Sequence, residues 1–332
     1  MTLIGITFPS VASAIAAAGG KLAGVETRSV EAAGLAALLF RSKEPSWQFL
    51  RRSRTALESM VRAQRILEAA AVFGPLLPAR PGSLIRDDVE ACTLLCGQWR
   101  QLAESLRLHG NTTQFQITIT WNPMAALAAR RDHPDLVAAA AAGARGESKE
   151  AGDLISRFMT DERAAFGAKA MRALAAVAED VIALPVDQAD MLVNAAVLLA
   201  SGAEPDLERA LETLDSSHPG ENRIRLIGPL PPVSFAAVAI ERPNRERVVA
   251  ARRLLGVDEA TAQRDLRRAY LDIARAHHPD TGAQATGAHA VGAAAEAFRL
   301  LARIAEAHLF ADQGDVLLVD IVRHDQHRSF ST

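Results

Sequence analysis

The residues whose types could take part in chemistry gather in one short stretch, Ala269 to Gly282, which reads AYLDIARAHHPDTG. It contains the tripeptide His278-Pro279-Asp280, and the same tripeptide occurs earlier as His133-Pro134-Asp135. Histidine and aspartate serve in proton transfer and metal binding, but such sites need further groups at a defined spacing. The sequence has no G-x-S-x-G, no phosphate-binding glycine loop and no histidine pair at metal spacing. We therefore expect no enzyme, no bound metal and no cofactor.

The elements predicted around the second tripeptide form a helical hairpin. A short helix ends at Gly256, and Thr261 is placed to cap the next one. Pro279 breaks that next helix and a further apolar helix follows, so the two long helices are expected to pack antiparallel with the tripeptide at their tip. Spacing predicts an apolar face of Leu266, Tyr270, Ile273 and His277 and an opposite basic face of Arg264, Arg267, Arg268 and Arg275.

This pattern resembles a J-domain, the module by which DnaJ-type co-chaperones bind a partner chaperone. The resemblance covers about Arg245 to Phe310 and rests on LLGV, AT, LRRAY, HHPD and the following apolar helix. It implies docking on a DnaK-type chaperone, and stimulation of its ATPase, through His278, Pro279, Asp280, Arg267, Arg268 and Arg275. The segment departs from the family where Leu271-Asp272 replace a common basic pair and where the tyrosines usual before LGV are absent. A plain turn after a helix end remains the alternative for His278.

The first tripeptide lacks these surroundings. No LGV stretch, capped helix or hairpin partner accompanies His133-Pro134-Asp135. Pro134 is well placed at the first turn of a helix, where a missing N–H costs nothing. We therefore expect the two copies to differ in role, with the first marking a helix start.

Composition narrows the class of protein. The chain has 332 residues, of which 49% are hydrophobic and 23% charged, and its net charge is −2. These values fit a globular chain of about two domains, with three as the alternative, and the lack of a basic excess argues against a nucleic-acid partner. No apolar run is long enough to cross a membrane. Cys92 and Cys96 lie one helical turn apart and are expected to be reduced core residues, as in a cytoplasmic protein.

Two Pro- and Gly-rich segments carry a second resemblance, to gas vesicle accessory proteins of the GvpF/GvpL type. The resemblance spans about residues 25 to 240. The first segment, Leu77 to Ser83, includes the family positions Pro78, Arg80 and Gly82, and the second, Gly228 to Phe235, includes Gly228, Pro229, Pro231, Pro232, Ser234 and Phe235. Leu230, Val233 and Pro81 stand where the family usually has aromatic residues. A rigid corner without partner contact is the alternative for both segments, and Arg80 is a candidate to pair with a helix C-terminus or an acidic partner.

The predicted fold is α+β, with two ferredoxin-like domains joined by helices, a helical J-domain-like insertion and a final strand. We expect an N-terminal domain at 1–125, a helical connector at 126–178, a second domain at 179–243 plus 313–325, and the J-like segment at 244–312. The strand at 113–121 is assigned to the first sheet, whose helices are expected on one face. The last strand, Asp315 to Asp325, is expected to join the second sheet.

Together the two resemblances imply a non-enzymatic protein of gas vesicle assembly, located in the cytoplasm and on the vesicle. Its partners would be the hydrophobic shell protein, other gas vesicle accessory proteins and a DnaK-type chaperone, but neither nucleic acid nor a membrane. The alternative is a general J-domain co-chaperone with an unusual client-binding half. A third possibility is an enzyme whose site the sequence does not reveal.

Overall fold

The computed structural model describes residues 1–41, 54–217, 222–258, 261, 263–277, 286–308 and 317–323. Contacts between residues divide the chain into two compact units. The first unit comprises Met1–Arg107 and Ala237–Ile321, and the second comprises Leu108–Ala236 and Val322–Thr332. Both units contain helices and strands, so the predicted mixed α and β class is confirmed.

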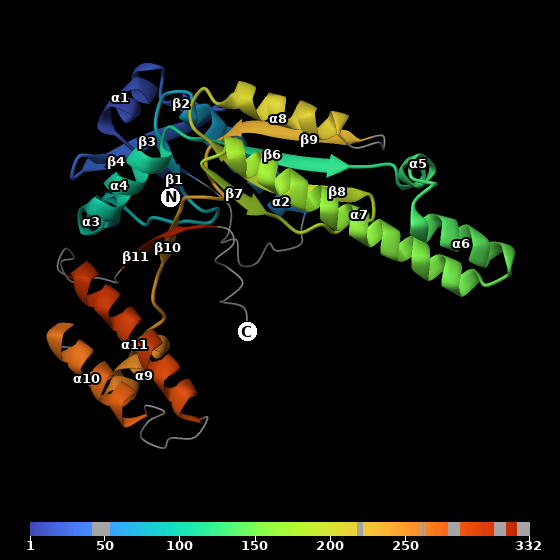
Figure 1. Cartoon of the computed structure of the whole chain (residues 1–332). Coiled ribbons are helices and arrows are strands. Elements are labelled where there is room, and N and C mark those ends of the chain that lie inside the picture. The colour runs from blue at the N-terminus through green and yellow to red at the C-terminus, as the bar shows by residue number, and fades with distance from the viewer. Residues whose placement is uncertain are drawn as a thin grey trace. The chain divides into compact units, whose positions relative to one another are not determined.

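An antiparallel sheet forms the centre of the N-terminal part of the first unit, with the strand order β2-β3-β4-β1-β5 among the described residues. The elements of this part are β1 (Thr2–Thr7), α1 (Pro9–Ala17), β2 (Lys21–Leu22), β3 (Val25–Ala32), β4 (Leu35–Phe40), α2 (Arg54–Ala71), β5 (Leu76–Pro78), α3 (Asp88–Gly97) and α4 (Trp99–His109). Every residue of β4 is buried, so both faces of the sheet are covered. Figure 1 shows α1 and α3 on opposite sides of it, which corrects the expectation of helices on one face.

A tight hairpin connects β3 and β4. Ala32 pairs with Leu35, which leaves Ala33 and Gly34 as a loop of two residues. Both loop residues have positive φ angles, 52° and 76°. A loop with both central residues at positive φ matches the right-handed twist of the strands, and glycine favours it because it has no Cβ.

The range from Asp88 to His109 holds two helices rather than one continuous helix. α3 ends at Gly97 and α4 begins at Trp99, with Gln98 between them in a non-helical conformation. The N-cap of α3 is Asp87, whose side chain accepts a hydrogen bond from the Glu90 N–H at 2.8 Å. Asp88 instead pairs with Arg28 on β3.

Cys92 and Cys96 lie on α3 and are free thiols. Both are only half-buried, so the expectation that they belong to the core is wrong. The fully buried positions of α3 are taken by Ala91, Leu94 and Leu95.

The second unit holds another antiparallel sheet, with the strand order β7-β8-β6-β9 among its described residues. Its elements are β6 (Thr113–Thr120), α5 (Pro123–Ala129), α6 (Pro134–Ala144), α7 (Ser148–Val177), β7 (Asp180–Ala183), β8 (Met191–Leu199), α8 (Glu204–Ser216) and β9 (Arg223–Leu230). One face of the sheet packs on α7 and α8 around Ile117, Val197, Leu174 and Leu211. The core is mostly aliphatic, with Phe115, Trp121 and Phe166 as its buried aromatic residues.

The strand predicted from Thr113 lies in this second sheet, not in the first. It pairs with β8 along its whole length and with β9 on its other side. The strand itself was predicted from alternating apolar and polar residues, but alternation does not say which distant strand pairs with it. Here Ile117 and Ile119 face the core of the second unit, so burial of this face selects the second sheet.

The helical range between the sheets contains a hairpin of α6 and α7, visible in Figure 1. A short break separates the two helices, because α6 ends at Ala144 and α7 begins at Ser148. Ala139 and Ala142 of α6 and Phe158 of α7 are buried. The remaining residues of α6 are largely exposed.

The C-terminal part of the first unit contains β10 (Ala237–Glu241), α9 (Arg245–Leu255), α10 (Gln263–Ala276), α11 (Thr286–His308) and β11 (Leu318–Val322). The expectation that the last strand joins the second sheet is wrong, because β11 pairs with β10 in a separate sheet. The two strands flank the helical segment in the chain, and Leu318 of β11 is buried against the helices.

Candidate functional site

The first Pro- and Gly-rich segment, Leu77 to Ser83, is held by backbone hydrogen bonds on two sides. Ala79 N–H donates to the Ile4 carbonyl at 2.8 Å, and Leu3 N–H donates to the Ser83 carbonyl at 2.8 Å. On the other side Arg80 N–H donates to the Val238 carbonyl of β10, also at 2.8 Å. The segment therefore lies between β1 and β10, where its prolines are tolerated because the bonding donors are its other residues.

Glycines allow the close fit of this segment. A Cβ added at Gly5 of β1 would lie 2.6 Å from the Leu77 carbonyl oxygen, so only glycine permits this approach. Gly82 has a φ of 86°, within a turn in which Ser83 N–H donates to the Arg80 carbonyl at 3.1 Å. A side chain there would strain the backbone. The side chain of Arg80 is exposed, so its pairing with a helix end or an acidic partner stays a prediction.

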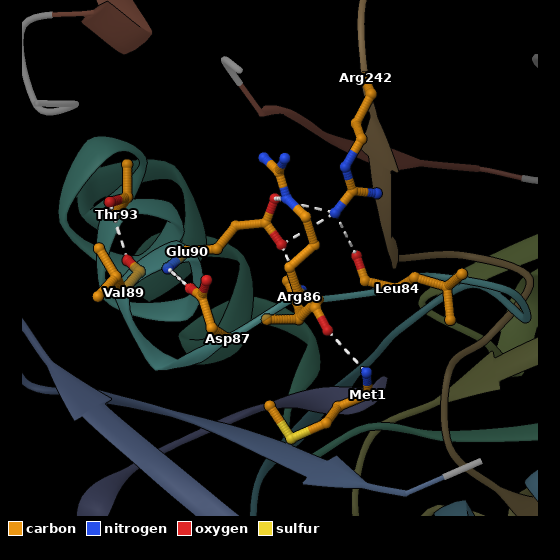
Figure 2. A network of polar contacts seen from close by, with 9 residues as sticks. Met1, Leu84, Arg86, Asp87, Val89, Glu90, Thr93 and Arg242 are labelled. Carbon is orange, nitrogen blue, oxygen red and sulfur yellow. Dashed lines mark hydrogen bonds and ion pairs between the residues drawn. The ribbon is translucent and has the colours of Figure 1, made fainter. Parts of the chain in front are cut away.

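A buried carboxylate lies beside the same segment, at the start of α3 (Figure 2). The side chain of Glu90 is only 7% exposed. Arg86 Nε donates to its Oε1 at 2.9 Å, and the Arg86 N–H donates to its Oε2. Arg242, just after β10, donates through Nη2 to both carboxylate oxygens at 2.9 Å and to the Leu84 carbonyl at 2.9 Å. We call these three residues, Glu90, Arg86 and Arg242, the carboxylate clamp.

The carboxylate clamp is suited to holding elements together rather than to catalysis. A buried carboxylate is costly unless paired, and here guanidinium groups from two parts of the chain supply the partners. Both oxygens of Glu90 accept hydrogen bonds from arginine donors. The clamp joins α3, the loop before it and the chain that leaves β10.

The second Pro- and Gly-rich segment, Gly228 to Phe235, forms a corner at the end of β9. The Pro232 carbonyl accepts from the N–H groups of Phe235 and Ala236 at 3.0 and 2.9 Å. Phe235 is 5% exposed and packs on Ile182 and Leu198. Ser234 N–H donates to Gln114 Oε1 at 2.8 Å, and Gln114 is itself buried. The corner is thereby fixed to β6, β7 and β8.

Gly228 cannot carry a side chain in this corner. Its φ is 157°, and an added Cβ would lie 2.9 Å from the Gln114 carbonyl oxygen and overlap the Phe115 ring. The family positions Pro231 and Pro232 are buried, whereas Gly228 and Pro229 are exposed to solvent. These contacts account for the residue types of the segment by packing within the second unit.

The helical segment has the predicted stop and the predicted faces. Gly256 follows α9 in the left-handed conformation, with a φ of 66°, and its N–H donates to the Arg253 carbonyl at 3.2 Å. Leu266 is buried, and Tyr270 stacks on Phe298 of α11 with ring centroids 5.4 Å apart. The predicted basic residues Arg267, Arg268 and Arg275 are exposed, and Arg275 lies 3.4 Å from the Asp272 carboxylate.

The two tripeptides have different surroundings, and one of them is outside the described residues. His278, Pro279 and Asp280 fall there, so their predicted role as a docking tip stays a prediction. In the first copy, His133 caps α6 through Nδ1, which accepts from the Asp135 N–H at 3.3 Å. Pro134 begins the helix, which confirms the predicted helix start.

Other chemistry-bearing groups do not assemble into a site in the described part of the chain. No group of three or more His, Cys, Asp or Glu side chains there is placed to hold a metal ion. None of the described helices is both long and apolar enough to cross a membrane. His109 is partly buried, and this burial lowers its pKa below the usual range while Asp180 and Glu179 oppose the shift. One pocket, lined by Met1, Arg28, Arg41, Arg86, Asp87, Asp88 and Val89, is open and shallow.

Sequence reasoning missed the residues that anchor the two segments. Glu90 and Arg86 are four residues apart on a helix start, a spacing that could have suggested an ion pair. Arg242 is separated from Glu90 by 152 residues, and Gln114 from Ser234 by 120. No local pattern in the sequence marks such pairs.

The chain is similar to known gas vesicle proteins. A family model described as "Gas vesicle synthesis protein GvpL/GvpF" matches residues 4–237. The crystal structure of GvpF from Anabaena sp. PCC7120 is similar with a TM-score of 0.52 and 24% identity, covering 70% of this chain and 93% of that one. GvpF from Microcystis aeruginosa is similar with a TM-score of 0.50 and 22% identity, covering 70% of this chain and 97% of that one. None of the curated proteins matches the chain.

The family match covers both Pro- and Gly-rich segments and ends where β10 begins. Arg242 of the carboxylate clamp and the helices α9 to α11 lie beyond it. The matched range is more than half of the chain. The chain therefore belongs to the GvpL/GvpF family of gas vesicle synthesis proteins.

Proposed function

We propose that the protein is a non-enzymatic accessory factor of gas vesicle assembly, acting in the cytoplasm and on the vesicle. It binds the hydrophobic shell protein, other accessory proteins or both, and it keeps the shell protein from aggregating before assembly. The observation that carries this proposal is the family match over residues 4–237. Exposed apolar strands make a shell monomer prone to aggregate, which gives such a factor its task.

The helical segment supplies a second activity, recruitment of a DnaK-type chaperone. Its support is the packing of α10 and of α9 on α11, with an exposed basic face on α10. Arg267, Arg268 and Arg275 lie on that face, and the tripeptide His278-Pro279-Asp280 follows α10 in the chain after one residue, His277. The resemblance to a J-domain implies that this face and the tripeptide would engage the chaperone.

Both units have the element order of a ferredoxin-like layer, which supports the two-domain architecture expected from the sequence. In the second unit the order is strand, helices, strand, strand, helix, strand, with β9-β6-β8-β7 across the sheet. The first unit has the same order of strands and helices in the elements β1, α1, β3, β4, α2 and β5. Its strands lie in the order β5-β1-β4-β3 across the sheet. We assign each unit to this fold on that basis.

Light scattering of shell protein diluted from denaturant tests the holding activity. The chain at near-equal molar ratio should lower the scattering of the shell protein, and an unrelated aggregating protein should not be protected. Equal protection of both proteins would favour a general co-chaperone, the alternative that the α10 basic face also supports. Absence of protection for either would contradict the holding activity.

Recruitment of a DnaK-type chaperone is tested separately. The chain should stimulate the ATPase of a DnaK-type chaperone, and His278→Gln should abolish that stimulation without changing protection of the shell protein. Arg131→Gln, an exposed change in the second unit, is the matched control. If the His278→Gln variant supports vesicle assembly as well as the parent chain does, the recruitment of a DnaK-type chaperone is contradicted.

A further inference from the structure

The outer edge of β9 is an unused sheet edge in the second unit. β9 is the last strand in the order β7-β8-β6-β9, and among the described residues only β6 pairs with it. Figure 1 shows it at the margin of the sheet. Arg223, Arg225 and Leu226 are exposed, and Leu226 is 39% exposed despite being a large apolar residue. An edge of this kind presents unpaired N–H and carbonyl groups that can receive another strand.

The two faces of β9 differ in chemistry. Ile224 pairs with Ile119 and Leu226 with Ile117, and both partners belong to the core beneath α7 and α8. Directly paired residues share a face, so Ile224 and Leu226 lie on the helix-covered side. Arg225 pairs with Thr118, which places it on the opposite side of the sheet. Arg223, two residues away, shares that side.

The positive charge on this side is uncompensated within the described residues. Neither Arg223 nor Arg225 forms an ion pair with a described residue, and their cross-strand partners are the neutral Thr120 and Thr118. The acidic residues of α8, such as Glu208 and Glu212, are on the helix that covers the other face. A strand added beside β9 would therefore meet positive charge at every second position on one face and exposed Leu226 on the other.

We propose that the β9 edge binds an extended segment of a partner protein as an added strand, with carboxylates at alternate positions and apolar side chains between them. Carboxylates would lie beside Arg223 and Arg225, and apolar side chains would extend the surface of Ile224 and Leu226. Pro229 has no N–H, so the added strand ends near Ile227. The identity of the partner as an assembly client rests on the proposed function, whereas the site itself does not.

A second copy of the chain is a poorer occupant. Two copies could pair antiparallel through their β9 edges, with the arginines of both copies on one side of the joined sheet. Arg223 of one copy would then lie opposite Arg225 of the other, or the Arg225 residues of the two copies would lie opposite each other. Like charges directly opposite each other destabilise strand pairing. Charge complementarity therefore favours an acidic strand over self-association.

Fluorescence anisotropy with a labelled peptide of alternating Glu and Val, eight residues long, tests the site on the full chain. The Glu/Val peptide should bind, whereas an alternating Lys/Val peptide should not. N-methylation of the Glu/Val peptide at alternate amides should abolish binding, because strand addition needs those N–H groups.

The double variant Arg223→Glu with Arg225→Glu should weaken binding of the Glu/Val peptide at least about tenfold and confer binding of the Lys/Val peptide. Arg131→Glu with Arg157→Glu, the same charge change at exposed positions in the second unit, should leave binding unchanged.

Several results would overturn the proposal. They are absence of binding, equal binding of the N-methylated peptide, and equal loss of binding in the control double variant. A concentration-dependent dimer in sedimentation that disappears in Arg223→Glu with Arg225→Glu would assign the edge to a second copy instead. Protection of the shell protein tests the other claim: if the chain binds the peptide but fails to protect shell protein, the site stands and the proposed function fails.

Discussion

At the scale of single residues, the chain uses charged and polar side chains to join distant segments. Glu90 is buried and held by Arg86 and Arg242, and Gln114 is buried and holds the backbone of Ser234. Arg28 and Asp88 form an ion pair in which both side chains are exposed to solvent, by 46% and 56%. The first two arrangements are sensitive to substitution, because a buried group left without its partner loses both solvent and protein contacts.

Glu90→Gln should lower the free energy of unfolding by about 3 kcal/mol, because it leaves two guanidinium groups without their buried carboxylate. Urea denaturation with the m-value monitored measures this loss. Asp88→Asn is the matched control, since an exposed pair contributes about 0–1 kcal/mol. Equal effects of the two substitutions would contradict the assignment of Glu90 as a buried clamp.

His109 should make stability depend on pH. Burial lowers its pKa in the folded chain below that of the unfolded chain. The neutral form is therefore favoured by folding, so this contribution is present above the unfolded pKa of about 6.5 and is lost as the pH falls below that value and through the lower pKa of the folded chain. Unfolding measured between pH 8 and 5 should show a decline that His109→Gln reduces. If the stability of the His109→Gln variant declines as much as that of the parent chain, the pH dependence belongs to other groups.

At the scale of elements, glycines at positive φ set where strands meet. Gly34 closes the β3–β4 hairpin, Gly82 turns the first Pro- and Gly-rich segment, and Gly228 starts the corner after β9. Of these three glycines, Gly228 is the one that combines a positive φ with close neighbours, the Gln114 carbonyl and the Phe115 ring. The cost of a side chain there is therefore both conformational and steric.

Gly228→Ala should destabilise the chain by about 3 kcal/mol or more, through strain and overlap together. Gly202→Ala is the matched control, because Gly202 has a φ of 86° and no atom within 4 Å of an added Cβ. The control should cost about 1–2 kcal/mol from backbone strain alone. Thermal unfolding of both variants measures the difference, and equal costs would refute the close packing of Gly228 on β6.

Local elements were predictable from local chemistry, and their partners were not. Pro134 marked the start of α6, and the alternation after Thr113 marked β6. The alternation could not tell which sheet would receive β6, because strand pairing depends on residues far away in the chain. The cap of α3 is Asp87, and local chemistry does not single it out, because the neighbouring Asp88 satisfies the same sequence rule.

The candidate site was predictable to a similar extent. The two Pro- and Gly-rich segments were found from their residue types, and the structure adds what they contact. Their anchors, Arg242 and Gln114, were missed because a buried ion pair or amide bond leaves no periodic trace in the sequence. The C-terminal tripeptide lies outside the described residues, so its role still rests on the sequence resemblance.

At the scale of the whole molecule, the chain combines a family region with a C-terminal extension. The family region ends at residue 237, and the extension begins with β10, which pairs with the first Pro- and Gly-rich segment through Arg80 and Val238. Arg242 of the extension then completes the carboxylate clamp. The extension is thus fastened to the family region by backbone and side-chain contacts.

Arg242→Ala should loosen the attachment of the extension without unfolding the helices. Removing Arg242 leaves Glu90 with Arg86 alone, so β10 loses its side-chain anchor. Hydrogen exchange of the β10 amides should rise by about tenfold or more, while exchange in α11 stays unchanged. Arg247→Ala, which breaks an exposed pair with Glu241, is the control. Unchanged β10 exchange in Arg242→Ala would contradict the anchoring role.

The central claim is that gas vesicle assembly depends on this chain. The most direct measurement counts gas vesicles by electron microscopy in cells that lack the chain and in the same cells supplied with it again. The account predicts few or no intact vesicles without the chain, aggregated shell protein in their place, and recovery when the chain is restored. Normal vesicle numbers with soluble shell protein in cells that lack the chain would contradict it.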